Sequence, residues 1–594
     1  MSIPQIIRDC SEKWKDNAVV KTKIGGTYKD ISWGKFYNLI ARMATALANE
    51  GLKPGDKAAI MSHTRYEWTA SDAAILTTGG IVVPIYPNLT AHEAKRLIER
   101  SHSSFLFVSD PELVELALSI IDDLEMVKKV IVFEDDAMDG VNHPKFIALS
   151  EFANVDADMA LIDERLSNIK NDDIFTIIFT SGTTGEPKGV MLTHDNIRSN
   201  AETALELFDI GVGDIHLSHL PLAHVLERMA SVVMLISGAT TAYAEHITKV
   251  ADNLQEVKPT VSVSVPRIFE KIYTAIRTGA MESGAPKKQI AFWALDVAEQ
   301  AGKLWDVGQK PSGFLGLQFS LADKLVYSKI RDRFGGRIRY FISGGAPLAP
   351  ELATFFNTIG IPVYEGYGLT ETSPIISANR VGNQKSGSVG PVIPRVEVKL
   401  AEDGEIVVKG PNVFSGYFED EEATKAALTA DGWFSTGDIG RFDDEGRLYI
   451  TDRKKDLIVT AGGKNIAPQK IENVLKMDKY LEEVMVYGDA KKFISALIVP
   501  DFEMLKKYAD HKKLEYTDMT SLVSNPEVVS LIERRIKKHQ KDNDFASYES
   551  VKKFVLLDHP FSAGDGEVTP TLKMRRANII KHYKEALEAL YYED

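Results

Sequence analysis

Residues 180 to 190 have the composition of a phosphate-binding loop. Their sequence is Thr-Ser-Gly-Thr-Thr-Gly-Glu-Pro-Lys-Gly-Val, and they directly follow an apolar run at 174 to 179 that predicts a buried strand. Glycines let the backbone bend so that several N–H groups face one anion, hydroxyl side chains add donors, and Lys188 adds a positive charge. The segment therefore predicts a loop that holds a polyphosphate.

The spacing of this loop differs from that of the common P-loop. The P-loop motif needs a lysine and then a hydroxyl residue directly after its second glycine, whereas Gly185 is followed by Glu186, Pro187 and Lys188. A simple nucleoside triphosphatase is therefore disfavoured. For this segment taken alone, a solvated polar surface loop is the alternative interpretation.

Two glycine-rich segments further along the chain have complementary chemistry. Residues 341 to 347, Phe-Ile-Ser-Gly-Gly-Ala-Pro, predict a strand followed by a turn where the backbone can approach a flat ring closely. Residues 364 to 372, Tyr-Glu-Gly-Tyr-Gly-Leu-Thr-Glu-Thr, place an aromatic side chain between glycines and then a hydroxyl and a carboxylate. The aromatic ring can stack on a base, and Glu371 with Thr183 or Thr184 could hold the Mg²⁺ that accompanies a triphosphate.

Two C-terminal segments supply a carboxylate and a lysine. Residues 431 to 438, Asp-Gly-Trp-Phe-Ser-Thr-Gly-Asp, end in a carboxylate that suits two ribose hydroxyls. Residues 566 to 576 contain Thr569-Pro570-Thr571, which predicts an extended approach that presents Lys573. Taken singly, the segments have structural alternatives: a core tyrosine, a type I turn or an exposed lysine.

Composition limits the classes of protein that this chain can belong to. Its 594 residues predict roughly three to four compact units, or one large domain plus a smaller one. The 44% of hydrophobic and 26% of charged residues are typical of a globular protein. The net charge of −14 disfavours broad nucleic-acid binding, and no nucleic-acid partner is expected. The single cysteine, Cys10, excludes an intrachain disulfide and a cysteine-based metal cluster. The start of the sequence shows no secretory signal, and the apolar window 230 to 244 is shorter than the roughly 20 residues of a spanning helix, so it predicts buried core.

Hydrophobic patterns divide the chain into regions of different texture. From about residue 30 to 270, helical patterns alternate with short apolar runs, which predicts parallel strands joined by helical crossovers. The clearest helices are predicted at 32 to 49 and 90 to 101, and the clearest strands at 57 to 61, 81 to 85 and 105 to 108.

Three later regions complete the predicted architecture. Residues 271 to 335 are helical and charged, and they either line an entrance to the site or embellish the surface. Residues 387 to 450 predict a β-rich subdomain, and the charged Asp-Arg-Lys-Lys-Asp at 452 to 456 separates it from a new βα pattern.

The predicted fold class is therefore α/β, with a large N-terminal domain of parallel βα subdomains plus the β-rich subdomain, and a smaller mobile α+β C-terminal domain. The predicted boundaries are 1–452 for the N-terminal domain, 453–456 for a hinge linker and 457–594 for the C-terminal domain.

In order and over residues 10 to 590, these segments resemble the acyl-adenylate-forming (AMP-binding) superfamily, which includes acyl-CoA synthetases, firefly luciferases and the adenylation domains of peptide synthetases. Two further segments are similar to long-chain fatty acyl-CoA synthetases rather than to activators of acetate, coumarate or amino acids. They are Leu-Pro-Leu-Ala-His-Val-Leu-Glu-Arg at 220 to 228 and Val-Pro-Arg-Ile-Phe-Glu-Lys at 265 to 271.

The resemblance implies that the glycine-rich loop grips the β- and γ-phosphates of ATP. The residues with that implied role are Thr180, Ser181, Gly182, Thr183, Thr184, Gly185 and Lys188. The residues implied to surround adenine are Gly345, Ala346, Pro347, Gly366 and Tyr367. Thr370 is implied to contact the α-phosphate, Glu371 with Thr183 to bind Mg²⁺, and Asp438 with Arg453 to bind ribose.

The same resemblance implies two half-reactions. Lys573 is expected to act in the first, in which a fatty acid and ATP give acyl-AMP and pyrophosphate, and His224 is either a gate beside the carboxylate or a structural histidine. In the second, coenzyme A takes the acyl group after the C-terminal domain turns about Lys455, a hinge assigned to within one residue because Lys454 precedes it. Gly462 and Gly463 would then leave room for the pantetheine arm.

The expected function is thus ATP- and Mg²⁺-dependent ligation of a long-chain fatty acid to coenzyme A. Two alternatives stay open: a ligase that passes the acyl group from acyl-AMP to a carrier protein, and an inactive nucleotide-binding sensor with the same fold. Acyl chain length is marked by no local motif. The expected location is cytoplasmic, and the sequence leaves open both a homodimer and peripheral contact with the inner membrane surface.

Overall fold

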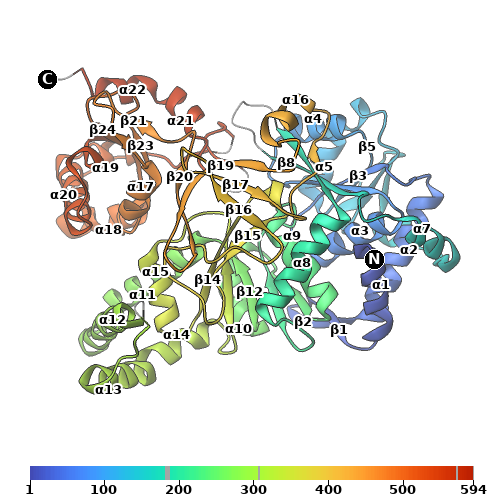
Figure 1. Ribbon diagram of the computed structural model, residues 1–594, viewed down its shortest axis with the longest axis horizontal. Helices are drawn as coiled ribbons and strands as arrows, with labels where there is room; N and C mark the ends of the chain where they lie inside the picture. The colour runs from blue at the N-terminus through green and yellow to red at the C-terminus, as the bar shows by residue number, and fades with distance from the viewer. Residues whose placement is uncertain (181–186, 306–307, 563, 570–572, 593–594) are drawn as a thin grey trace.

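The computed structural model describes residues 1–180, 187–305, 308–562, 564–569 and 573–592. Two mixed sheets lie side by side within the larger part of the molecule (Figure 1). In spatial order, the first consists of β18 (Gly416–Tyr417), β9 (Lys188–Thr193), β8 (Ile174–Thr180), β4 (Ile81–Ile85), β3 (Lys57–Met61), β5 (Ser103–Val108), β6 (Lys129–Val132) and β7 (Phe146–Ala148). The second consists of β15 (Ile375–Ala378), β14 (Val363–Gly368), β13 (Tyr340–Ser343), β12 (Val261–Ser264), β10 (Ile215–Ser218), β11 (Thr240–Tyr243), β1 (Ala18–Ile24) and β2 (Thr27–Ser32).

Both sheets are parallel in their interior, as the alternation of helices and strands predicts. They become antiparallel at their edges, where short loops join neighbours such as β8 with β9 and β14 with β15. A short connection forces this change, because parallel neighbours need a long crossover.

A helical layer between the two sheets forms the main core. It consists of α1 (Ile3–Lys13), α2 (Trp33–Asn49), α3 (Tyr66–Thr77), α8 (His194–Phe208) and α9 (Val225–Ser237), with α6 (Leu149–Phe152) and α7 (Met159–Asn168) beside it. The apolar window at 230 to 244 is the end of α9 followed by β11, and its buried side chains confirm the prediction of core. None of the helices in the described ranges is both long and apolar enough to cross a membrane.

Outer helices cover the far face of each sheet. The first sheet is covered by α4 (Ala91–Ser101) and α5 (Pro111–Ile120). The second is covered by α10 (Val250–Val257), α11 (Pro266–Glu282), α12 (Ala285–Trp305), α13 (Gly313–Ala322), α14 (Ser328–Arg333) and α15 (Pro350–Thr358). Local sequence fixes where these helices begin: Thr90 and Glu93 form a reciprocal capping box at the start of α4.

The predicted β-rich subdomain is a four-stranded antiparallel sheet. Its strands are β16 (Glu397–Leu400), β17 (Glu405–Lys409), β19 (Phe434–Phe442) and β20 (Leu448–Arg453), and α16 (Glu421–Ala427) lies in the β17–β19 connection. β20 ends at Arg453, where the charged segment begins, so this sheet leads the chain directly towards its C-terminal part.

The C-terminal part has its own sheets and its own core. Its strands are β21 (Ile458–Val459), β22 (Asn465–Ile466), β23 (Leu481–Tyr487), β24 (Ile494–Pro500) and β25 (Val551–Leu556). One face of the β23–β24–β25 sheet packs on α17 (Pro468–Lys476), α18 (Phe502–Lys512), α19 (Met519–Val523) and α20 (Pro526–Asp542), and the other on α21 (Arg576–His582) and α22 (Lys584–Ala589).

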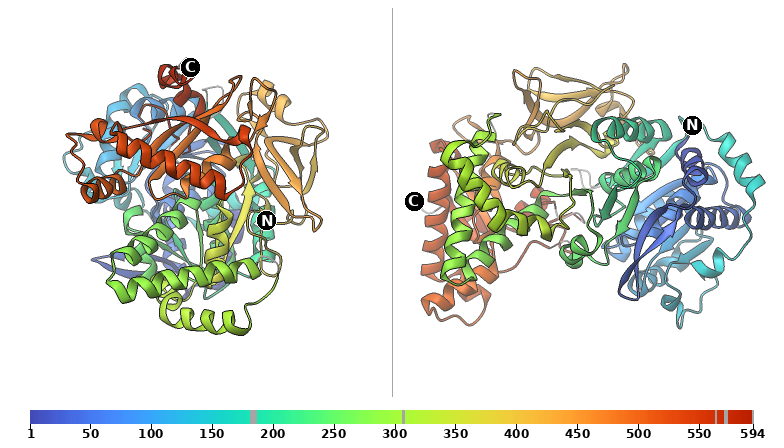
Figure 2. Two further views of the ribbon diagram at one scale, coloured as in Figure 1. Left: turned by 90° about the vertical axis from the view of Figure 1, so that its left-hand side faces the viewer. Right: turned by 90° about the horizontal axis from the view of Figure 1, so that it is seen from below.

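This part lies beside α11 and α12, which are more than 150 residues away in sequence (Figure 2). Arg267 at the start of α11 forms ion pairs with Glu482 and Glu483 of β23, at 2.7 and 2.5 Å. Lys507 of α18 contacts Glu282 at the end of α11 at 2.9 Å. These pairs hold the C-terminal part against the second sheet's outer helices.

Candidate active site

A cavity of 3040 Å³ lies where the central strands of the second sheet end, between the large N-terminal part and the C-terminal part. The carboxyl ends of parallel strands are the usual place for a ligand in open α/β sheets. The predicted site residues that line the cavity are Thr180, Lys188, His224, Gly345, Ala346, Pro347, Gly366, Tyr367, Thr370, Glu371, Asp438, Arg453, Lys455 and Lys573. Their segments are far apart in sequence, so the fold brings them together.

Some predicted residues cannot be placed, and two lie elsewhere. Ser181, Gly182, Thr183, Thr184 and Gly185 fall outside the described residues. Gly462 and Gly463 are exposed and do not line the cavity.

The two ends of the glycine-rich segment stand next to each other at the cavity wall. Thr180 ends β8 and pairs with Lys188, the first residue of the antiparallel strand β9. The predicted loop is therefore the connection of a hairpin within the first sheet. Because Thr180 and Lys188 both line the cavity, the loop begins and ends at the site.

Tyr417 connects this lysine to the predicted metal-binding carboxylate. The Lys188 Nζ lies 4.9 Å from the centre of the Tyr417 ring, and the Tyr417 hydroxyl donates a 3.0 Å hydrogen bond to Glu371 Oε1. Burial raises the pKa of Glu371, and the bond from Tyr417 opposes that rise. Sequence reasoning missed Tyr417, because only the pairing of β18 with β9 brings it to the site.

The Glu371 carboxylate suits a cation that arrives with its own oxygen ligands. Among the residues that the structure describes, no cluster of three or more His, Cys, Asp and Glu side chains forms a preformed metal site. One carboxylate plus substrate phosphates is the usual way that Mg²⁺ is held in nucleotide sites. The donor set therefore fits Mg²⁺ bound together with a triphosphate.

A second polar group combines an aromatic ring, a carboxylate and a guanidinium. The Tyr367 hydroxyl donates a 2.7 Å hydrogen bond to Asp438 Oδ2, and the Arg453 Nε lies 3.2 Å from Asp438 Oδ1. Asp438 and Arg453 face each other across β19 and β20, so the register of this sheet sets their contact. The next residue after Tyr367 must be glycine, because a Cβ at Gly368 would lie 1.6 Å from the carbonyl oxygen of Pro374.

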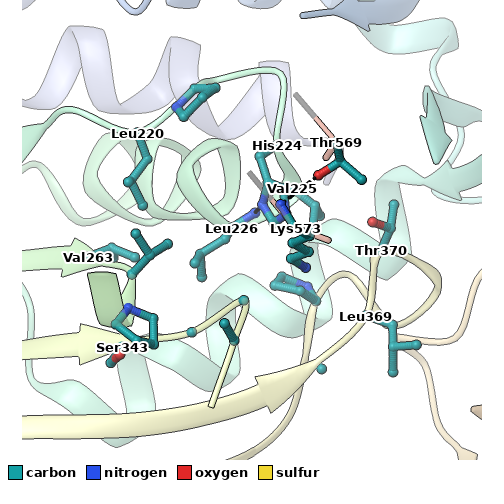
Figure 3. A pocket seen from close by; sticks show the side chains of 18 of the residues that line it. Leu220, His224, Val225, Leu226, Val263, Ser343, Leu369, Thr370, Thr569 and Lys573 are labelled. Carbon is teal, nitrogen blue, oxygen red and sulfur yellow. Dashed lines mark hydrogen bonds between the residues drawn. The ribbon is translucent and has the colours of Figure 1, made fainter. Parts of the chain in front are cut away.

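Lys573 points into the cavity from the C-terminal part (Figure 3). Its side chain is exposed to the cavity space, but the protein around it still excludes part of the water, and this desolvation together with the nearby Arg453 lowers its pKa to about 8. The carboxylates of Asp438 and Glu371 oppose that fall. The lysine is therefore less firmly charged than a surface lysine.

Hydrogen bonds join the described residues on either side of 570–572. The Thr569 N–H donates to the Lys573 carbonyl at 2.8 Å, the Lys573 N–H donates to Thr569 Oγ1 at 3.0 Å, and Val568 pairs with Met574 in antiparallel fashion. The prediction of an extended approach at 569–571 therefore stays a prediction, because only Thr569 of that segment is described. Residues 570–572, between the two sides, lie outside the described residues.

His224 immediately precedes α9 and lies beside Lys573 (Figure 3). Its Nδ1 accepts a 3.2 Å hydrogen bond from the Leu226 N–H, which is an N-cap interaction. Burial and the neighbouring Lys573 lower its pKa to about 3, so the imidazole is neutral. The structure thus gives His224 a local structural role and leaves its other face towards the cavity.

Away from the charged groups, the cavity becomes apolar. In Figure 3, Leu220, Leu226 and Val263 lie on one side, and Thr370 and Lys573 on the other. The apolar lining residues come mainly from α8, α9, β12 and β13 and are Ala204, Phe208, Val225, Leu226, Met229, Val233, Met234, Val261, Val263 and Ile342. One continuous cavity therefore joins a charged region to an apolar one.

Glu365 is a further lining residue that sequence reasoning did not single out. It lies on β14 next to Gly366 and accepts a 3.2 Å hydrogen bond from the Gly387 N–H. Burial raises its pKa to about 8, so this carboxyl group is mostly protonated at neutral pH and can donate a hydrogen bond. Its place within the strand, directly after the buried Val363 and Tyr364, was the signal that the sequence offered.

Comparisons with known proteins agree with this geometry. The sequence matches the AMP-binding enzyme family over residues 7–418 and the AMP-binding enzyme C-terminal domain over residues 455–594. It is 35% identical over 582 residues to a long-chain-fatty-acid–CoA ligase of Mycobacterium bovis, covering 98% of this chain and 95% of the relative. It is 31% identical over 606 residues to the peroxisomal long chain acyl-CoA synthetase 7 of Arabidopsis thaliana, covering 98% of this chain and 85% of the relative.

Solved structures show the same fold at lower sequence identity. The adenylation domain of a carboxylate reductase from Mycobacterium chelonae matches with a TM-score of 0.79 and 21% identity, over 100% of this chain and 91% of that one. ATP-bound MatB from Rhodopseudomonas palustris matches with a TM-score of 0.71 and 24% identity, over 99% of this chain and 100% of that one.

Proposed function

This chain belongs to the AMP-binding enzyme family, and from that premise we propose that it is an AMP-forming long-chain fatty acid–CoA ligase. A carboxylate oxygen of the fatty acid attacks the α-phosphorus of ATP, the bond between that phosphorus and the bridging oxygen breaks, and pyrophosphate leaves. The coenzyme A sulfur then attacks the carbonyl carbon of acyl-AMP. The carbon–oxygen bond to AMP breaks, and the thiol proton is released.

The observation that carries this proposal is the lining of the cavity, which is charged in one region and apolar in another. A fatty acid needs an apolar channel for its chain that ends where its carboxylate meets the α-phosphate. The apolar residues of α9 and β12 would line this channel, and His224, Thr370 and Lys573 line the same cavity. The names of the relatives support the same substrate class.

Charge explains the need for Lys573 in the first half-reaction. A carboxylate and a phosphate about 4 Å apart repel each other, and the repulsion grows as water is excluded. The proposed role of the Lys573 ammonium is to neutralise charge that builds up on the oxygens around the α-phosphorus. Thr370 would donate a hydrogen bond from its hydroxyl to the same phosphate. His224 is neutral, so it adds no positive charge beside Lys573.

The remaining site residues bind the nucleotide in this proposal. Thr180, Lys188 and the loop between them would hold the β- and γ-phosphates, with Tyr417 positioning Lys188 and Glu371. Mg²⁺, when bound, supplies charge neutralisation between the phosphates, and Glu371 with Thr183 are its proposed protein ligands. The residues proposed to surround adenine are Gly345, Ala346, Pro347, Gly366 and Tyr367. Asp438 would accept hydrogen bonds from ribose, with Arg453 beside it.

The second half-reaction requires a different orientation of the C-terminal part. Lys573 occupies the cavity here while Gly462 and Gly463 are exposed outside it, so this arrangement suits the first half-reaction. We assign the hinge to Lys455, within the proposed linker 453–456 that separates domains 1–452 and 457–594. The family match to the C-terminal domain begins at residue 455, which supports this boundary.

The decisive experiment measures pyrophosphate release with ATP and Mg²⁺ over acids from acetate to oleate, with and without coenzyme A. Turnover that peaks at long chains and requires coenzyme A supports the proposal, and Lys573→Ala should slow acyl-AMP formation by orders of magnitude. A single stoichiometric burst unaffected by coenzyme A would favour a carrier-protein acceptor. No pyrophosphate release with any of the acids, with nucleotide binding retained, would favour a sensor.

A further inference from the structure

A histidine in the apolar region of the cavity is held by a buried glutamate. His216 lies on β10 and lines the cavity, and Glu227 lies in the first turn of α9, within the segment 220 to 228. The His216 Nε2 lies 2.9 Å from Glu227 Oε1, and both side chains are almost completely buried. The chemistry proposed above uses neither residue, so the pair needs another explanation.

The register of the second sheet places His216 among the strands that form the wall of this region. His216 pairs with Val261 of β12, and Val261 pairs with Tyr340 of β13, so the three residues form one row across the sheet. All three line the cavity. Tyr340 begins β13 and Ser343 ends it, so this row lies about 10 Å from the carboxyl end of the strand, at roughly 3.3 Å per residue. The row is therefore set back from the charged groups.

The other polar rings in this part of the wall already have hydrogen-bond partners. His219 uses both ring nitrogens, with the Leu217 carbonyl oxygen at 3.0 Å and Ser264 Oγ at 3.2 Å. The Tyr340 hydroxyl donates to a backbone carbonyl of α8. Within the described residues, the His216 ring makes its one hydrogen bond through Nε2. Nδ1 is therefore the ring nitrogen left to a ligand.

Glu227 is not fully satisfied by this arrangement. Its Oε2 is buried and has no hydrogen-bond partner among the residues that the structure describes. A buried oxygen without a partner is unfavourable, and an apolar side chain here would suit a plain alkyl chain better. The one hydrogen bond of this carboxyl group goes to His216, which indicates that Glu227 positions the ring.

We propose that His216, positioned by Glu227, is a specificity-determining residue that selects fatty acids with a hydroxyl group part-way along the chain. A plain alkyl chain would cover Nδ1 without offering it a hydrogen bond. A hydroxyl can donate or accept, so it suits either tautomer of the ring. A site that hydrogen-bonds a substrate group disfavours the analogue that lacks it. The inference rests on the proposed function, because it names the substrate class of the same cavity.

The test compares stearate with stearic acids that carry one hydroxyl at successive carbons, by kcat/KM for pyrophosphate release with ATP, Mg²⁺ and coenzyme A. At one or two adjacent positions we expect kcat/KM to exceed that for stearate by about tenfold or more. At other positions it should fall below stearate, because the hydroxyl meets an apolar wall. Stearic acids with a methyl group at the same carbons control for size. A flat response, or an equal maximum with the methyl group, would overturn the proposal.

Substitutions at the pair test the two residues separately. His216→Leu should abolish the maximum, and a maximum that persists would contradict the proposal. Glu227→Leu should flatten it because the ring is no longer held, whereas Glu227→Gln can still bond to Nε2 and should retain it. A purely structural role for Glu227 would change kcat/KM for all acids alike. Each result is a ratio between two acids in one protein, so partial misfolding does not alter it, and Glu227→Leu serves if His216→Leu does not fold.

The matched control is His539→Leu. It removes another contact between a histidine and a carboxylate, the 2.9 Å contact of His539 with Asp478 in the C-terminal part. The maximum should stay in place in this variant. Its loss would show that the ratio responds to damage anywhere in the protein and would overturn the assignment to His216.

Equilibrium binding without ATP separates this inference from the proposed function. Dissociation constants for the same acids can be measured by isothermal titration calorimetry. About tenfold tighter binding at one hydroxyl position, by a protein that forms no acyl-AMP from any acid, would support the His216 site and contradict the ligase assignment. Acyl-AMP formation from plain acids with no preferred hydroxyl position would support the ligase and contradict the role of His216.

Discussion

The charge on Lys573 depends on pH within the range in which enzymes are assayed, because desolvation and Arg453 both disfavour the ammonium form. Its pKa is lowered from 10.5 to about 8, whereas the proposed role requires the protonated form. Above pH 8 the free enzyme loses this charge, so kcat/KM for ATP in acyl-AMP formation should fall about tenfold for each further pH unit. The measurement is pyrophosphate release between pH 6 and 10.

The control is Lys573→Arg, since an arginine stays charged throughout this range. Any activity that it retains should lack the fall above pH 8. An unchanged pH profile in the arginine variant would mean that a different group titrates.

Tyr417 makes a second prediction at the residue scale. Tyr417→Phe keeps the ring beside Lys188 but removes the 3.0 Å hydrogen bond to Glu371. Since a hydrogen bond to a charged group contributes about 1.5–3 kcal/mol, the Mg²⁺ concentration for half-maximal activity should rise about tenfold or more. Tyr487→Phe, which removes a bond to Glu588 in the C-terminal part, is the matched control and should leave this concentration unchanged.

At the scale of elements, the first turn of α9 has a structural role that its motif does not reveal. The segment 220 to 228 lines the acyl side of the cavity, but its final residue, Arg228, points into the core. Arg228 contacts Asp72 of α3 through two bonds of 2.5 and 3.1 Å and donates to Thr176 of β8 at 2.6 Å. It therefore links α9 to α3 and to β8, the strand that leads into the glycine-rich loop.

Arg228→Met should lower stability by about 3–5 kcal/mol, because it leaves the buried Asp72 carboxylate without its partner. The measurement is the denaturation midpoint of the N-terminal part. The double variant Arg228→Met/Asp72→Leu should recover most of the loss, since apolar residues can replace a buried ion pair. If the double variant is as unstable as the single one, packing rather than the unpaired charge is responsible.

At the scale of the whole molecule, ion pairs between distant segments hold the present orientation of the C-terminal part. Arg267→Ala removes the contacts with Glu482 and Glu483. Partly exposed ion pairs contribute up to about 1 kcal/mol each, so acyl-AMP formation should slow about two- to fivefold. Thioester formation from supplied acyl-AMP should be unaffected or faster, and Arg339→Ala, which breaks a pair within the N-terminal part, is the control.

Lys455→Pro should impair the second half-reaction more than the first, which is the opposite of the effect expected for Arg267→Ala. A proline restricts φ at the proposed hinge and hinders rotation, so transfer from supplied acyl-AMP to coenzyme A should suffer more than acyl-AMP formation. Equal loss in both half-reactions would contradict rotation about this residue. Together the two variants test whether one enzyme uses two orientations.

Much of the fold follows from local sequence. The strands at 57–61 and 81–85 are confirmed with the predicted limits, and the helix at 90–101 begins one residue later because Thr90 is its cap. The hydrophobic period and helix capping depend on residues that are neighbours along the chain, so they can be read from a single sequence. The family resemblance is confirmed by the match over residues 7–418. The sequence could reveal it because each glycine-rich turn and its charged residues are neighbours along the chain.

The sequence by itself thus determined the α/β class, the β-rich subdomain and the segments that line the cavity. Only the tertiary structure decided that Tyr417 joins Lys188 to Glu371, that Lys573 loses part of its basicity and that Arg228 serves the core. It also decided that Phe314 and Leu317 of α13 are exposed. The physical reason is that strand pairing, burial and the approach of charges depend on segments that are tens to hundreds of residues apart, whereas sequence patterns record only neighbours along the chain.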